Sequence, residues 1–93
     1  MHEEYIKETK IKEKNDNERK LELIISIIKT KRKLQDDITN YEFAHDELID
    51  YYLYNIKANQ AKLDYLIKKA KASGISLERI NEIEYSLKAK GYQ

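Results

Sequence analysis

Proline is absent from this chain of 93 residues, and only two glycines occur, Gly74 and Gly91. Because proline and glycine are the residues that most often interrupt a helix, a chain that nearly lacks them can form helices of many turns. Charged residues make up 38% of the sequence, and Lys, Glu, Leu and Ile are abundant, as in long helices with a solvated face. The sequence therefore predicts an all-α fold in a single domain.

Three amphipathic stretches divide the chain. Apolar residues recur at three- and four-residue steps in 17–39, 46–73 and 77–90, so each range is predicted to form one helix. The first two are expected to form a long antiparallel hairpin, because their connection is short. The third helix is expected either to close over one side of the hairpin or to reach a second subunit. Residues 1–16 are strongly polar and are predicted to be an arm outside the helical domain of 17–93.

The predicted helix ends carry capping residues. Asp16 or Asn17 is the expected N-cap of the first helix, and Ser76 that of the third, because their side chains can accept a backbone hydrogen bond. Gly74 suits the left-handed position that closes the second helix, with Ile75 as the apolar residue that follows it.

The connection between the first two helices contains two aromatic residues. Thr39 and Asn40 are weak helix formers, so the first helix is expected to end there. Tyr41 and Phe43 follow, and we expect them to fold back and cover the end of the hairpin.

The helix predicted over 46–73 carries two packing stripes, whereas a helix with one neighbour needs only one. We therefore expect this helix to be central. Its second stripe alternates bulky and small side chains; alanine lets another backbone come close, and tyrosine suits a half-buried boundary. This stripe is the predicted interface with a second copy, with helix 77–90 and another protein as the alternatives. It consists of Tyr51, Tyr54, Ala58, Ala61 and Tyr65.

Asn59 and Gln60 stand in the same helix where leucine would be expected. A buried polar layer of this kind fixes register and partner number in helical assemblies, at some cost in stability. We interpret the pair in this way, in preference to a polar functional site.

The run from the aromatic turn to Gly74 resembles the YaaL-like family, small bacterial proteins of unknown function that come mostly from Firmicutes. The resemblance extends from the second half of the first helix through Gly74. It implies no known activity. This chain departs from the family pattern in two ways. It has an acidic residue, Asp46 or Glu47, where many relatives carry proline, and its third helix extends beyond the usual end of the family. The matching positions are Phe43, Leu48-Ile49-Asp50, Leu53-Tyr54, Ala58, Ala61, Tyr65-Leu66-Ile67 and Lys68 to Lys71.

The net charge of +1 argues against a dedicated nucleic-acid binder, which usually carries a clear basic excess. One basic cluster nevertheless offers candidate phosphate contacts, and a nucleic-acid accessory role is kept as the alternative function. A solvated helix face is the simpler interpretation of the cluster, which consists of Lys29, Lys31, Arg32 and Lys33.

Catalysis and cofactor binding find little support. The chain has no cysteine, no glycine-rich phosphate loop and two histidines in polar segments. His45, Asp46, Glu47 and Asp50 have metal-ligand side chains, but they are explained more simply as acidic residues at a helix start. We therefore predict no enzymatic activity, no metal and no cofactor.

No signal peptide is expected, and the longest apolar run, LIISII, contains a serine and is too short to span a bilayer. The sequence thus predicts a cytoplasmic interaction or adaptor protein, without membrane association, that forms a homodimer.

Overall fold

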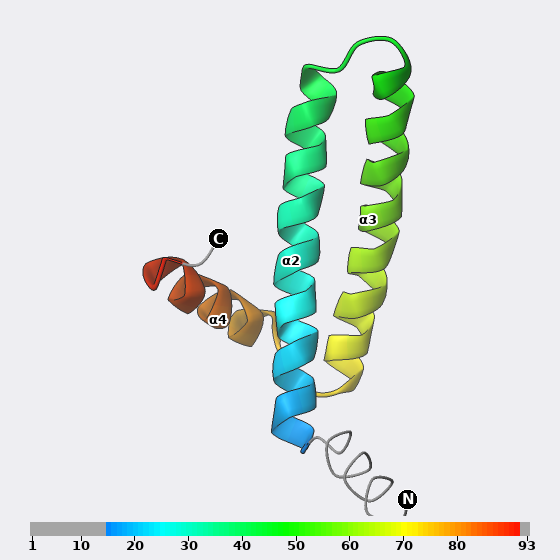
Figure 1. Ribbon diagram of the computed structural model, residues 1–93. Coiled ribbons are helices and arrows are strands. Elements are labelled where there is room, and N and C mark those ends of the chain that lie inside the picture. Colours follow the sequence, from blue (N-terminus) through cyan, green and yellow to red (C-terminus); the bar gives the residue numbers. More distant parts are fainter. Residues whose placement is uncertain (1–14, 92–93) are drawn as a thin grey trace, which may run out of the picture.

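The computed structural model describes residues 15–91, which form three helices with no strand among them. Helix α2 spans Asp16–Glu42, α3 spans Glu47–Ala72 and α4 spans Leu77–Ala89. α2 and α3 lie side by side and antiparallel, and we call the end with their connection the tip and the opposite end the base (Figure 1). The predicted helical hairpin with a shorter third helix is confirmed. The predicted polar arm lies almost entirely outside the described residues.

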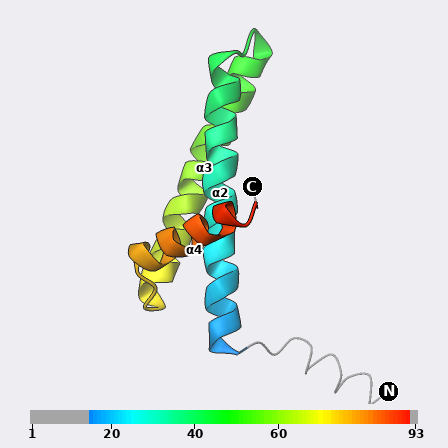
Figure 2. The same ribbon diagram turned by 90° about the vertical axis from the view of Figure 1, so that its left-hand side faces the viewer.

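α4 packs against α2 and not against α3. It leaves the base and crosses α2 on the side away from α3, as the two views agree (Figures 1 and 2). Within the described chain the central helix is therefore α2, and the second neighbour expected for helix 46–73 is not part of this chain's described residues. The outer face of α3 is also not covered by α4.

The hydrophobic core lies at the base, where α2 has α3 on one side and α4 on the other. Isoleucines of α2 pack there against the last turns of α3 and the first turns of α4. Leu23, Leu63, Ile67, Ile83 and Leu87 pack around this cluster. Towards the tip, no apolar side chain of the described chain is fully buried. The hairpin is thus held mainly at one end, by Ile24, Ile27, Ile28, Leu66, Ala70, Ile75 and Ile80.

The first helix begins one residue earlier than predicted. Asn15 is the N-cap, and its side-chain oxygen accepts a hydrogen bond from the backbone N–H of Glu18 at 2.8 Å. The side-chain amide of Asn15 also donates to the Glu18 carboxylate at 3.2 Å, which holds the capping side chain in place. At the start of α4, Ser76 accepts from the N–H of Arg79, as predicted.

α2 continues to Glu42, beyond the predicted end at Thr39. The hydroxyl of Thr39 donates to the carbonyl of Gln35 at 3.1 Å, so the helix accommodates this weak helix former. The tip remains open: Tyr41 is exposed and Phe43 is 75% exposed. The expectation that these two aromatic residues cover the end of the hairpin is therefore wrong.

The turn between α3 and α4 is a Schellman motif, as predicted. Gly74 has φ of +82°, its N–H donates to Lys71, and the N–H of Ile75 donates to the carbonyl of Ala70 at 2.9 Å. Ile75 is buried in the core beside Ala70. This turn directs the chain back towards α2.

Candidate interaction surface on α3

The tyrosines and alanines that the sequence singled out form one exposed stripe along α3, which we call the tyrosine–alanine stripe. Tyr51 is 54% exposed, Tyr54 67% and Tyr65 61%. Ala58 and Ala61, which lie between them, are also exposed. The structure therefore brings all five predicted interface residues together on one surface.

This stripe is turned away from the hairpin because of the helical repeat. Leu66 and Ala70 are buried against α2, and Asn59 and Leu63 are half-buried on the same face. At 3.6 residues per turn, the tyrosine–alanine stripe falls roughly opposite these residues. No described element covers it, since α4 lies beyond α2 (Figure 1).

Two of the exposed rings have local contacts. Tyr51 packs edge to face against Tyr52, with ring centroids 4.9 Å apart. The Lys69 ammonium lies 6.0 Å from the centroid of the Tyr65 ring, at the outer limit of a cation–π contact. These contacts fix the rings in part and leave their outer faces accessible.

A polar contact links α2 to α3 beyond the core. The carboxylate of Asp37 is fully buried and accepts one hydrogen bond from the amide of Asn59, at 2.8 Å across the helices, and one from the ammonium of Lys33, at 2.7 Å along α2. The proximity of Asp37 raises the pKa of Lys33 above its ordinary value. A buried carboxylate needs such partners, so this pairing is favourable only in one register of the hairpin.

Asn59 therefore has the contact expected of a register-setting residue, whereas Gln60 is exposed and does not share it. Asp37 was not predicted to be buried. It lies seven residues after Thr30, which is also buried and whose hydroxyl donates to the backbone carbonyl of Ser26 at 2.7 Å. Lys33 one turn before Asp37 is a sign of the contact in the sequence, but such a pair is equally typical of a solvated helix face.

The basic cluster on α2 is partly neutralised by acidic partners. Lys31 forms an ion pair with Glu84 of α4 at 2.7 Å, and Lys33 binds Asp37. Arg32 is half-buried, and its Nη2 atom lacks a hydrogen-bond partner among the described residues. Lys29 is exposed. The four candidate phosphate contacts thus do not form one accessible basic patch.

Glu84 gives the docking of α4 a pH dependence. The hydrogen bond from Lys31 lowers the pKa of the Glu84 carboxyl below its ordinary value of 4.5, against the opposing effect of burial. A lowered pKa in the folded state means that the pair stabilises the fold above about pH 4.5 and loses this contribution as pH falls through the lowered value. We expect Glu84→Gln to cost about 1 kcal/mol of unfolding free energy near neutral pH and less than this at about pH 3. Urea denaturation of both proteins at the two pH values measures this difference, and an equal cost at both would contradict it.

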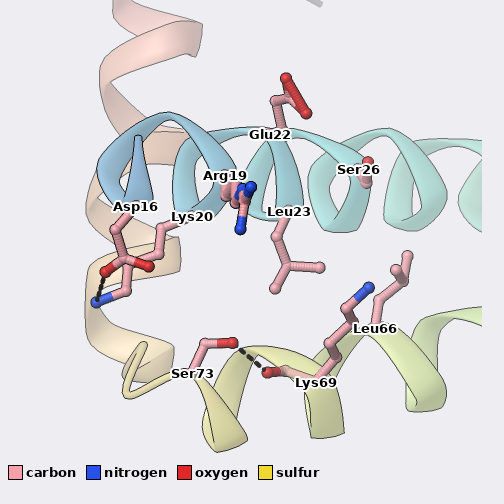
Figure 3. A pocket seen from close by; sticks show the side chains of 9 residues that line it. All are labelled: Asp16, Arg19, Lys20, Glu22, Leu23, Ser26, Leu66, Lys69 and Ser73. Atoms are coloured by element: carbon pink, nitrogen blue, oxygen red, sulfur yellow. Dashed lines mark hydrogen bonds and ion pairs between the residues drawn. The ribbon is translucent and has the colours of Figure 1, made fainter. Parts of the chain in front are cut away.

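A groove of about 640 Å³ opens at the base between the start of α2 and the end of α3 (Figure 3). Leu23 and Leu66 point towards each other in it, and the charged side chains lie at its rim, where Asp16 pairs with Lys20 at 3.3 Å. The Ser73 hydroxyl donates to the backbone carbonyl of Lys69. The lining therefore offers an apolar floor and a rim of mixed charge.

Among the described residues, no three metal-ligand side chains lie close enough to hold an ion, and this includes the acidic start of α3. None of the described helices has the length and apolarity needed to cross a membrane.

Fold and surface together define a small all-α hairpin protein with an exposed aromatic face. The chain belongs to a family whose model, described as "Protein of unknown function (DUF2508)", matches residues 3–77. The match ends at the first residue of α4, so nearly all of the third helix lies beyond the matched residues. No curated protein and no solved structure matches the chain.

Proposed function

We propose that this protein is a non-enzymatic interaction protein that self-associates through the tyrosine–alanine stripe of α3. The observation that supports this most directly is the exposure of Tyr51, Tyr54 and Tyr65 along one helix face. Monomeric proteins rarely leave a contiguous surface of large apolar groups in water, and tyrosine contributes strongly at interfaces. Ala58 and Ala61 between the rings allow a second backbone to approach closely.

The proposal places the protein in the bacterial cytoplasm, among the YaaL-like proteins of Firmicutes. The absence of cysteine suits a reducing compartment. A nucleic-acid role has less support, because Lys31 and Lys33 already have acidic partners within the fold.

The double substitution Ala58→Glu/Ala61→Glu tests the interface. In an assembly it buries unpaired carboxylates, so we expect association to weaken at least about a hundred-fold. Size-exclusion chromatography with light scattering at micromolar concentration should give twice the chain mass of 11.1 kDa for the wild type and a single chain mass for the variant. Circular dichroism should show unchanged helicity.

Asn17→Glu/Asn81→Glu is the matched control, because it adds the same charge at exposed helical positions away from the stripe. This variant should remain dimeric. A wild-type protein of 11.1 kDa, or a double variant of Ala58 and Ala61 that associates as well as the control, would refute self-association through this surface.

A further inference from the structure

The tyrosine–alanine stripe of α3, extended by Lys68 and Ala72, follows a strict seven-residue repeat. Its members alternate three- and four-residue steps, which is the spacing of the seam between two coiled-coil helices. Only one bulky polar residue interrupts the apolar and small side chains. The seam consists of Tyr51, Tyr54, Ala58, Ala61, Tyr65, Lys68 and Ala72.

A row of charges with the same repeat flanks the seam on one side. Asp50, Lys57, Asp64 and Lys71 follow each other at steps of seven residues, and their charges alternate in sign. All four side chains are exposed, and none of them forms an ion pair within residues 15–91. Residues that flank a coiled-coil seam set the choice and orientation of the partner helix, so this row carries information about what the stripe binds.

We infer that α3 pairs with α3 of a second copy in antiparallel orientation, about a two-fold axis at the level between Asn59 and Gln60. The inference rests on the proposed self-association and adds its orientation and register. In this arrangement Ala58 lies opposite Ala61 of the second copy, at the centre. The small side chains there allow the closest approach of the two helices.

Tyrosines border this centre on both sides. Tyr54 lies opposite Tyr65 of the second copy, and the two-fold axis repeats the pair at the other end. Farther out, Tyr51 lies opposite Lys68 of the second copy, where the lysine stem can cover the ring. The polar residue in the seam therefore meets an aromatic partner and not a like charge.

The same register pairs every charge of the flanking row with its opposite. Asp50 lies beside Lys71 of the second copy, and Lys57 beside Asp64 of the second copy. The two-fold axis produces each pair twice. In antiparallel coiled coils, each residue of this flanking row lies beside a residue of the same row on the other helix. Because the charges alternate in sign along the row, each acidic residue then meets a lysine.

A parallel pair would not have this complementarity. It would bring Lys68 against Lys68 of the second copy inside the seam and Lys57 beside Lys62 of the second copy, and it would keep one attraction, between Asp64 and Lys69 of the second copy. Like charges at these positions oppose pairing. Charge therefore favours the antiparallel arrangement of the same apolar stripe.

Charge reversal tests the orientation. Lys57→Glu replaces two attractions by two repulsions, and we expect it to weaken dimerisation about ten-fold at low salt. Lys57→Glu/Asp64→Lys exchanges the charges and should restore the wild-type affinity. In a parallel pair, Lys57→Glu would instead strengthen association by facing Lys62. Sedimentation equilibrium of the three proteins gives these affinities.

Cross-linking tests the register in a chain that has no cysteine of its own. Asp50→Cys and Lys71→Cys proteins are mixed, equilibrated and treated with a short bis-maleimide. The antiparallel register places position 50 of one copy beside position 71 of the other, so the mixture should cross-link. Either variant alone should not, because its two cysteines would lie about 30 Å apart along the helices at 1.5 Å per residue.

The outcomes separate this inference from the proposed function. Cross-linking of each variant alone, or a gain in affinity for Lys57→Glu, would overturn the antiparallel register while self-association stood. A dimer that cross-links in neither sample would also overturn the register. A wild-type protein that stays monomeric throughout would refute both.

Discussion

Replacing Asn59 with leucine is expected to lower the free energy of unfolding by about 2–3 kcal/mol. The substitution removes the donor that reaches one oxygen of Asp37 across the helices, and leaves a charged oxygen buried without that partner. Lys33 still binds the other oxygen, which limits the loss. Urea denaturation at fixed protein concentration measures the change.

Two further variants show whether the buried carboxylate is the cause. Gln60→Leu makes a similar change at the next residue, which is exposed, and should alter stability by less than about 0.5 kcal/mol. Asp37→Leu/Asn59→Leu removes both residues of the hydrogen-bonded pair and should be far more stable than Asn59→Leu, because it leaves no carboxylate buried without its partner. If the double variant is the less stable of the two, the explanation fails.

Ile27→Ala should lower the free energy of unfolding by about 3 kcal/mol, with a fall in Tm of about 15 °C. The side chain of Ile27 is fully buried at the base. Its truncation leaves a cavity, and the few side chains of this small core cannot fill it. A domain of this length has only about 5–10 kcal/mol in total, so the loss is a large share of its stability.

Ile49→Ala is the matched control for this truncation, because it removes the same atoms near the tip, where Ile49 is exposed. We expect a cost below about 1 kcal/mol, since little buried surface is lost and alanine favours the helix. Thermal unfolding followed by circular dichroism compares the two variants. Similar losses would show that the tip is as well packed as the base.

Much of the fold was accessible from the sequence because it depends on local signals. The Gly74–Ile75 turn and the Ser76 cap each involve residues close together in the chain, and the structure has both where they were predicted. The end of α2 was misplaced by three residues because a weak preference at Thr39 was overcome by a hydrogen bond within the helix.

The sequence does not show in the same way which element packs against each helix face. A stripe on α3 shows that a surface suits packing, but it does not show which element packs there. The docking of α4 on α2 involves the Lys31–Glu84 pair, whose two residues are far apart in sequence. Asp37 was missed because a single acidic residue in an apolar seam resembles a solvated one until its partner, Asn59, is known. The five stripe residues could be grouped from the sequence because they share one helix.

Because α2 lies between α3 and α4, the outer face of α3 and the surface of α4 have no neighbours in common. Free-energy changes at two such separate sites add, usually to within about 0.5 kcal/mol. We therefore expect substitutions on the outer face of α3 to change the stability of the core at the base very little. Related chains can then differ in what they bind while they keep the same core.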